Sequence, residues 1–334
     1  MTNLKLPPRR NFLHLTVGAI ALPALLRTAK AQAYPTRPVT MVVPFAAGSG
    51  SDVLARILGP RLSEVLGQQV IIENIGGAGG MIGSARVAKA GPDGYQFILG
   101  STSTHAQNQS MFKNPLYNAA TDFAPVALAV DLPQVLVTRS SLSTNGVAEF
   151  AAYAKANQGK MQFGSAGVGS GSHLACALLN SALGLNVTHV PYRSSAQAMQ
   201  DLIAGQMDYF CPLLSAAISQ LDSKTIKAIA ILTRDRSPIL PNLPSAHEQG
   251  VTNFAADSWQ AFFLPKGTPA AIIQKLHDAA IATMETRAVQ DRLKETGATI
   301  VAPERRSPEY LRKFVEAEID KWARPIKANG ILAD

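Results

Sequence analysis

The residues that could do chemistry are mainly serines and glycines, and they gather in two stretches of the chain. The first contains the candidate ligand-binding residues Phe45, Gly48, Ser49, Gly50, Ser51 and Asp52, and the second contains Ser165, Ala166, Gly167, Gly169, Ser170, Ser172 and His173. Each stretch lies between a run typical of a strand and a run with helical spacing. A helix start presents unpaired N–H groups and the positive end of its dipole, and glycine lets a ligand approach the backbone. Two such turns facing each other predict a clamp for an anion, in which serine hydroxyls hold carboxylates without an arginine.

Several of these residues have more than one interpretation. A single glycine-rich turn is more often an ordinary capped connection, and only the pair of turns favours a ligand site. Asp52 is either an acid stabilised by the helix dipole or an acceptor for a ligand ammonium or an ordered water. Direct contact with a ligand carboxylate would be repulsive. Phe45 either lines the cleft or belongs to the core, and His173 either caps its helix or lines the cleft.

Further candidates lie next to other predicted strands. Ser101 and Thr102 come just after a strand end, where their hydroxyls would reach the same crevice, although an ordinary capped turn explains them equally well. Tyr192 and Arg193 also follow the end of a strand, and Asp208 stands where another strand begins. A solvated surface charge is the more common role for such an arginine, and a turn role is more common for such an aspartate.

The sequence argues against an enzyme. It has no G-x-S-x-G elbow, no G-x-x-x-x-G-K-[ST] phosphate loop and no complete G-x-G-x-x-G. Helical metal-ligand spacing is absent from the histidines that follow the first 33 residues, which are His105, His173, His189, His247 and His277. We therefore predict neither a metal nor a cofactor. A hydrolase using Ser170 or Ser172 is disfavoured because no base or oxyanion partner has the required spacing.

The elements that position these residues alternate along the chain. Short apolar runs and helical patterns follow one another, which predicts α/β domains with largely parallel, doubly wound sheets. Strands are expected at 39–43, 70–73, 97–99, 123–130, 135–138, 161–165, 187–190, 210–214 and 226–232. The last helices have few strands left to cover, so we expect them to return to the first domain. The predicted division is residues 34–134 plus 256–334 for one domain and 135–255 for the other.

Length and charge narrow the function further. A chain of 334 residues suits two domains with a cleft between them. The formal net charge is +8, but residues 1–33 hold five basic side chains and no acid, so the 26 basic and 23 acidic residues that follow leave only +3. A charge this weak over the rest of the chain is not typical of a nucleic-acid-binding protein.

Residues 1–33 have the features of a secretory signal peptide. A basic start precedes an apolar stretch at 15–26, and the small residue Ala33 ends the segment at the expected cleavage site. Arg9 and Arg10 resemble the twin-arginine export motif, with departures at residues 8 and 14. We expect export by this route to the periplasm of a Gram-negative bacterium.

The two cysteines of the chain, Cys176 and Cys211, permit one disulfide. An oxidising compartment would allow it, and the predicted elements do not forbid the geometry. The sequence leaves the pairing open.

Several short motifs occur in an order that resembles one family. They are Tyr34-Pro35, Val43-Pro44-Phe45-Ala46-Ala47-Gly48, Pro92-Asp93-Gly94-Tyr95, His189-Val190-Pro191-Tyr192 and Leu243-Pro244-Ser245. Together they resemble the Bug family of extracytoplasmic solute receptors, the binding subunits of tripartite tricarboxylate transporters. The resemblance spans nearly the whole chain after residue 33. It implies a type II periplasmic-binding-protein fold, with two doubly wound domains that close on a small organic acid in the cleft between them.

The resemblance also implies a site. The family holds a ligand carboxylate with two strand-turn-helix motifs, partly through bridging waters, and these correspond to Phe45 to Asp52 and Ser165 to Ser172. The usual Gly-Gly-Gly-Thr-Asp becomes Gly48-Ser49-Gly50-Ser51-Asp52, and the usual Pro-Tyr-Lys-Gly becomes Pro191-Tyr192-Arg193-Ser194. The second change removes a glycine and adds a forked donor. These departures bear on which ligand is bound.

We therefore predict a periplasmic solute-binding protein that acts as a monomer and needs no cofactor. Its expected ligand is a dicarboxylate, a tricarboxylate or an aromatic carboxylate, and its expected partners are the membrane permease subunits of a tripartite tricarboxylate transporter. The hinges are expected near 129–133 and 257–261. The alternative is a sensor that presents the bound carboxylate to a two-component histidine kinase, for which the binding physics would be the same.

Overall fold

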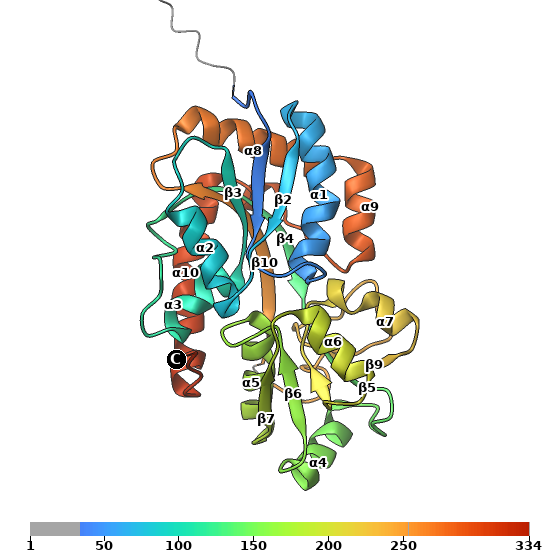
Figure 1. Ribbon diagram of the computed structural model, residues 1–334. Coiled ribbons are helices and arrows are strands. Elements are labelled where there is room, and N and C mark those ends of the chain that lie inside the picture. Colours follow the sequence, from blue (N-terminus) through green and yellow to red (C-terminus); the bar gives the residue numbers. More distant parts are fainter. Residues whose placement is uncertain (1–33, 253, 334) are drawn as a thin grey trace, which may run out of the picture. The chain divides into compact units, whose positions relative to one another are not determined.

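The computed structural model describes residues 34–252 and 254–333. The predicted signal peptide, residues 1–33, lies outside the described residues. From Tyr34 onward the chain forms one compact unit built around two sheets, which Figure 1 shows with their covering helices. None of the helices in the described part is long and apolar enough to cross a membrane.

The first sheet has six strands in the order β11-β4-β10-β3-β1-β2. Their bounds are β1 Val39–Val43, β2 Val70–Asn74, β3 Gln96–Ser101, β4 Phe123–Pro133, β10 Asp257–Pro265 and β11 Thr299–Ile300. Strands β2 and β3 run parallel to β1, whereas β10 is antiparallel to both β3 and β4, and β11 is antiparallel to β4.

The second sheet has five strands in the order β7-β6-β8-β5-β9. Their bounds are β5 Val135–Arg139, β6 Gln162–Ser165, β7 Thr188–Pro191, β8 Tyr209–Phe210 and β9 Ile226–Ile231. Strand β6 is parallel to β7 and β8, and β5 is antiparallel to β8 and β9. The expected strand at 210–214 is wrong beyond Phe210, because Pro212 has no amide N–H to extend the ladder and Leu214 begins a 3-10 turn.

Both sheets are mixed, so the expectation of largely parallel sheets holds only for part of each. The long strands β4 and β10 are antiparallel to each other, and β10 is the one that runs opposite to β3 and β1. They pair from Asp257 with Pro133 to Pro265 with Phe123. Strand β4 leads into β5 of the second sheet after one residue, Gln134, and β10 brings the chain back. The returning strand β10 is therefore inserted between β3 and β4 with the opposite direction, while β4 keeps the direction of β1 and β3.

The helices cover both faces of each sheet. Their bounds are α1 Gly50–Leu66, α2 Met81–Ala88, α3 Asn108–Met111, α4 Val147–Asn157, α5 Gly171–Leu183, α6 Ser195–Ile203, α7 Ile218–Asp222, α8 Ala270–Met284, α9 Arg287–Glu295 and α10 Pro308–Ala328. In Figure 1, α1, α8 and α9 lie on one side of the first sheet, and α2, α3 and α10 lie on the other. The return of the C-terminal helices to the first sheet is confirmed.

Alternation along β1 explains this two-faced covering. Met41 and Val43 pack into the apolar cluster that includes Leu54 and Leu58 of α1, while Val42 packs into the cluster on the opposite face. All these side chains are buried. Removing apolar side chains from water on both faces stabilises the strand.

A disulfide joins α5 to the segment after β8. It links Cys176 and Cys211, whose Cα atoms are 5.6 Å apart, and both residues are buried in the cluster around Phe150 and Tyr209. The pairing that the sequence left open is therefore made, and it connects the second glycine-rich motif to the sheet behind it.

Candidate binding site

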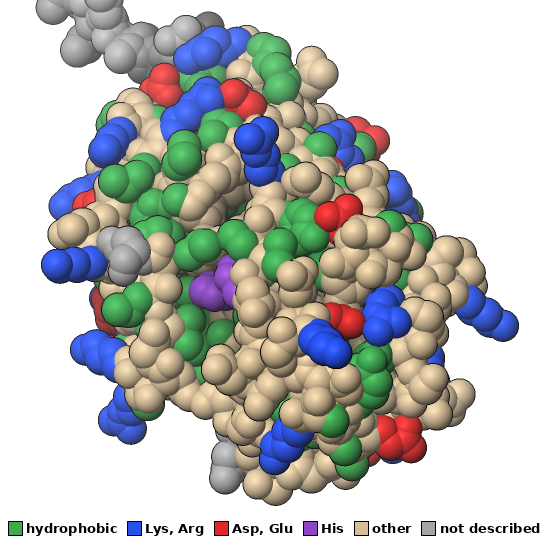
Figure 2. Space-filling model, turned by 60° about the horizontal axis from the view of Figure 1, so that its bottom comes forward, with side chains coloured by type: hydrophobic (Ala, Val, Ile, Leu, Met, Phe, Trp, Pro, Cys, Tyr) green, Lys and Arg blue, Asp and Glu red, His purple; other side chains and the backbone are tan. Residues whose placement is uncertain are grey.

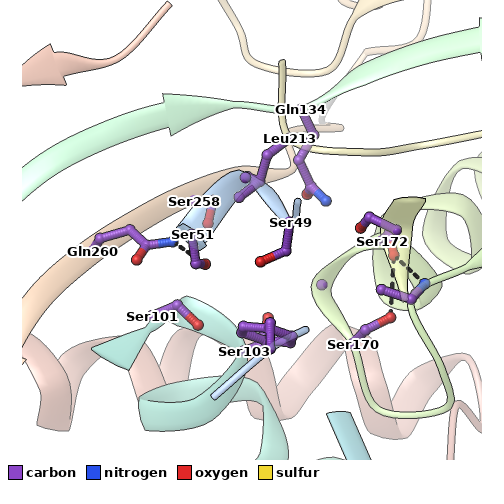
Figure 3. Close-up of a pocket in the computed structure, with 15 residues that line it drawn as sticks. Ser49, Ser51, Ser101, Ser103, Gln134, Ser170, Ser172, Leu213, Ser258 and Gln260 are labelled. Atoms are coloured by element: carbon purple, nitrogen blue, oxygen red, sulfur yellow. Dashed lines mark hydrogen bonds between the residues drawn. The ribbon is translucent and has the colours of Figure 1, made fainter. Parts of the chain in front are cut away.

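A cavity lined mainly by serines lies where the carboxyl ends of β1, β3 and β6 meet the crossing strands. Its lining residues are Phe45, Ser49, Gly50, Ser51, Ser101, Ser103, Gln134, Ala166, Ser170, Gly171, Ser172, Ser195, Leu213, Ser258 and Gln260. Figure 3 shows Ser49, Ser51 and Gln260 on one side of the cavity and Ser170 and Ser172 on the other. Among these described lining residues, no side chain carries a charge. The cavity volume is about 40 Å³, which is room for a few water molecules.

Helix α1 begins at the cavity. Ser49 caps it with a side-chain oxygen that accepts from the amide of Asp52 at 3.2 Å, and the Ser49 carbonyl accepts from Val53 at 3.0 Å. Within the described residues, the amide N–H groups of Gly50 and Ser51 have no such partner. These unsatisfied donors and the positive end of the helix dipole face the same space.

Helices α5 and α6 begin at the cavity in the same way. Ser170 caps α5 by accepting from the amide of His173 at 3.3 Å, and Ser194 caps α6 by accepting from Gln197 at 3.1 Å. The first residues of these helices, Gly171 and Ser195, line the cavity. Three helix starts therefore converge on a site without a charged side chain, an arrangement that attracts anions.

Asp52 lies behind the first turn and does not line the cavity. Its carboxylate accepts from the amide of Gly48 at 2.9 Å, from Arg56 Nε at 2.9 Å and from Asn74 Nδ2 at 3.0 Å. Burial raises the pKa of this carboxyl, but the hydrogen bonds from Arg56, Gly48 and Asn74 outweigh burial, so the pKa lies below its usual value. Asp52 therefore stays ionised and holds the turn in place, which matches the interpretation of Asp52 as a first-turn acid.

The second turn is held by neutral groups. The amide of Gly167 donates to Ser165 Oγ at 3.1 Å, and the amide of Ala166 donates to Ser172 Oγ at 3.0 Å. The oxygens Ser170 Oγ and Ser172 Oγ are 3.1 Å apart. Ser172 therefore supports the turn and lines the cavity at the same time.

Two stacked imidazoles lie beneath this turn. The rings of His173 and His189 are 4.1 Å apart between centroids, and His189 Nε2 is 2.7 Å from Ser165 Oγ. Burial lowers the pKa of both histidines to about 4, and for His189 the neighbouring His173 adds to the effect. Both rings are therefore neutral at neutral pH, and neither lines the cavity.

The remaining sequence candidates lie around the site or away from it. Thr102 accepts from the amide of Trp259 at 2.8 Å, and exposed Arg193 borders a separate recess next to Phe45 and Ser49. Asp208 lies at the opposite end of β6, where it pairs with Arg139 at 3.1 Å.

The structure therefore divides the predicted site residues into two sets. Those that line the cavity are Phe45, Ser49, Gly50, Ser51, Ser101, Ala166, Ser170 and Ser172. Those that do not are Gly48, Asp52, Thr102, Ser165, Gly167, Gly169, His173, Tyr192, Arg193 and Asp208.

Sequence reasoning missed the contribution of the crossing strands. Gln134 follows β4, and Ser258 and Gln260 lie on β10; Ser103, Gly171, Ser195 and Leu213 were missed as well. The available signal was a polar residue inside an apolar strand, since Gln260 stands between Trp259 and Ala261-Phe262-Phe263-Leu264. Such a residue needs a buried hydrogen-bond partner or a ligand.

The fold and the site are those of a periplasmic binding protein, a class in which the ligand lies at the strand ends of two sheets. The family model described as the tripartite tricarboxylate transporter family receptor matches residues 54–331, and the chain belongs to this family.

Basic side chains are scattered over the face shown in Figure 2 and do not gather at one place there.

Three solved structures are similar over nearly their whole length. The periplasmic binding protein BugD has 38% identity and a TM-score of 0.86, covering 90% of this chain and 99% of its own. MatC from Rhodopseudomonas palustris, solved with malate, has 36% identity and a TM-score of 0.85, covering 88% and 100%. Another R. palustris protein, solved with adipate, has 35% identity and a TM-score of 0.85, covering 90% and 99%.

Proposed function

We propose that this receptor binds a small organic carboxylate in the cavity and delivers it to a tripartite tricarboxylate transporter. The observation that carries the proposal is the convergence of the α1, α5 and α6 starts on a serine-lined cavity. A carboxylate would accept from the unpartnered amides of Gly50 and Ser51 and from the hydroxyls of Ser170 and Ser172. Helix dipoles and neutral donors hold an anion without the desolvation of an ion pair.

The relatives support this ligand class. MatC was solved with malate and the second R. palustris protein with adipate, and both ligands are dicarboxylates. The family match favours delivery to a transporter over presentation to a histidine kinase. Ser170 and Ser172 serve as helix cap and turn support, which favours a binding role over a nucleophilic one.

We further infer that residues 34–134 plus 256–334 and residues 135–255 are two domains that open and close. Strands of the first sheet come from the first set and strands of the second sheet from the other. A cavity of about 40 Å³ is too small for a dicarboxylate, so the ligand enters only when the two motifs separate. The expected hinges, near 129–133 and 257–261, lie on the two crossing strands.

The proposal includes the place of action. The basic leader and the family resemblance support export to the periplasm, by the twin-arginine route, of a monomeric receptor. Such a protein meets its ligand outside the inner membrane and its permease at the membrane surface.

Isothermal titration calorimetry tests the binding proposal. The purified protein is unfolded and refolded to remove any bound ligand, and is then titrated with malate, adipate, citrate and benzoate and with the diamides of malate and adipate. We expect saturable binding of at least one carboxylate at a ratio of one to one, and none of the diamides, because the helix starts select for negative charge. A folded protein that binds no carboxylate, or binds the diamides equally well, contradicts the proposal.

A further inference from the structure

Gln260 lines the cavity, and one polar atom of its side chain has no hydrogen-bond partner among the described residues. Its Nε2 donates to Ser51 Oγ at 2.6 Å, as the dashed line in Figure 3 shows. The residue is fully buried, and Oε1 has no hydrogen-bond partner among the described residues. A buried carbonyl oxygen without a donor is unfavourable, so this atom calls for a partner that enters with the ligand.

The backbone aims Gln260 at the site. Gln260 pairs with Ser101 on β3 and Val130 on β4, and the register between β10 and β4 shifts between Gln260 and Ala261. Such an irregularity bends the strand and redirects a side chain, and it is common next to binding sites. The neighbours Trp259 and Ala261 are buried in an apolar cluster. Gln260 is therefore a polar residue between apolar Trp259 and Ala261, placed where β10 passes the cavity.

The chemistry of Oε1 restricts the ligand. An amide oxygen only accepts hydrogen bonds, so it repels a carboxylate oxygen and requires a donor. An ammonium group is a poor match, because the described lining has no acidic side chain and three positive helix ends face the cavity. A hydroxyl group is neutral and donates one hydrogen bond.

We propose that Gln260 selects ligands that carry a hydroxyl group next to the carboxylate bound at the start of α1, which makes a hydroxy acid the preferred ligand. The selection rests on the proposed carboxylate-binding function. The residue that determines specificity, Gln260, therefore lies on a crossing strand and not on either glycine-rich motif. The distance from Gln260 to the helix start is short, because its amide already bonds to Ser51, the second residue of α1.

Matched ligand pairs test this selection. The native protein is titrated by calorimetry with malate and succinate, with lactate and propionate, and with citrate and tricarballylate, which differ within each pair only by the hydroxyl group. We expect the bound hydroxy acid to have an affinity at least about tenfold above that of its partner, in line with one buried hydrogen bond. Equal affinities within every pair that binds, or tighter binding of the acid without the hydroxyl, overturn the selection while leaving the carboxylate proposal intact.

Two variants locate the effect. Gln260→Met keeps the length of the side chain and removes the acceptor, so we expect it to weaken the hydroxy acid about tenfold and leave the unsubstituted acid nearly unchanged. Gln134→Met is the matched control, because Gln134 lines the same cavity but bonds to the carbonyl of Cys211 at 3.2 Å. It should change both members of a pair by the same factor. If Gln134→Met loses the preference for the hydroxy acid and Gln260→Met keeps it, the assignment to Gln260 is contradicted. If Gln260→Met does not fold, the matched ligand pairs on the native protein still test the preference for hydroxy acids. A folded native protein that binds no carboxylate at all overturns the proposed function and the selection together.

Discussion

The two glycine-rich motifs have the same local form but are held by opposite means. The turn between β1 and α1 is fixed by an ionised carboxylate, with Asp52 accepting from Gly48, Arg56 and Asn74. The turn between β6 and α5 is fixed by hydroxyls and by the neutral stack of His173 and His189. In both, the charged or aromatic support lies behind the turn and the donors face the cavity. A site for an anion can therefore use charge for rigidity without placing it against the ligand.

The difference extends to the electrostatics of the two helix starts. Asp52 lies in the first turn of α1 and partly offsets its dipole, while Arg56 balances that charge from an exposed position. The first turn of α5 contains no acid. We infer that α5 supplies the stronger attraction for a carboxylate and α1 the more rigid frame.

The largest expected effects come from removing the side chains that support the two turns. Asp52→Ala leaves the amide of Gly48 and Arg56 Nε without their acceptor and removes one of the two acceptors of Asn74 Nδ2. We therefore expect the free energy of unfolding in urea to fall by about 2–3 kcal/mol and the ligand to bind more weakly. Ser170→Ala removes one cap and should cost about 1 kcal/mol of stability. Ser307→Ala is the matched control, because Ser307 caps α10 with the same geometry away from the cavity.

The control separates stability from binding. Ser307→Ala should lose as much stability as Ser170→Ala without changing the affinity for the ligand. Unchanged affinity in both Asp52→Ala and Ser170→Ala would show that the two motifs do not form the site. Equal losses of stability in these two variants would show that the charged support adds nothing to the first turn.

A tight contact between the segment after β2 and the second glycine-rich turn gives a second test. A Cβ atom on Gly79 would lie 2.3 Å from the carbonyl carbon of Gly169 in the second turn. Gly79→Ala should therefore disfavour the closed arrangement and weaken ligand binding at least about tenfold, as measured by calorimetry. Gly67→Ala is the matched control, since Gly67 also has a positive φ, of 70°, but nothing lies within 4 Å of its Cβ position. It should lose about 1 kcal/mol of stability and no affinity. Equal affinities in the two variants would mean that this contact plays no part in closure.

Much of this site could be predicted because its signals are local. A β-branched run, a glycine turn and a serine cap lie next to one another in the sequence, and together they placed β1 with α1 and β6 with α5. The strand prediction failed past Phe210, where Pro212 ends the ladder. It also missed that β4 and β10 run against their neighbours, because strand direction depends on how the two sheets are connected.

The parts that could not be predicted depend on distant contacts. The role of Asp52 was undecided because its partner Asn74 lies 22 residues away. Gln260 was missed because it reaches Ser51 across 209 residues of sequence. Asp208 was named from its position at a strand start, and the structure places it at the opposite end of β6 from the cavity. A strand start in a parallel pair is the wrong end for a ligand that binds at carboxyl ends.

The smallest expected effect sharpens the contrast between charged and neutral support. The pKa of His173 is lowered from 6.5 to about 4 by burial. The folded protein keeps this ring neutral while the unfolded chain takes up a proton, so stability falls as the pH falls from 6.5 toward 4. From pH 6.5 to 5.5 this histidine should account for about 1 kcal/mol of the loss. His173→Phe keeps a ring in the stack with Phe163 and His189 and cannot titrate, so urea unfolding at the two pH values should show a loss smaller by that amount. Asp52 affects stability only at lower pH, because its pKa is lowered in the folded protein. Its stabilising contribution is complete above the usual pKa near 3.8 and is lost as the pH falls below that value. Identical pH dependence in the native protein and His173→Phe would mean that the neutral stack does not support the second motif in the way described.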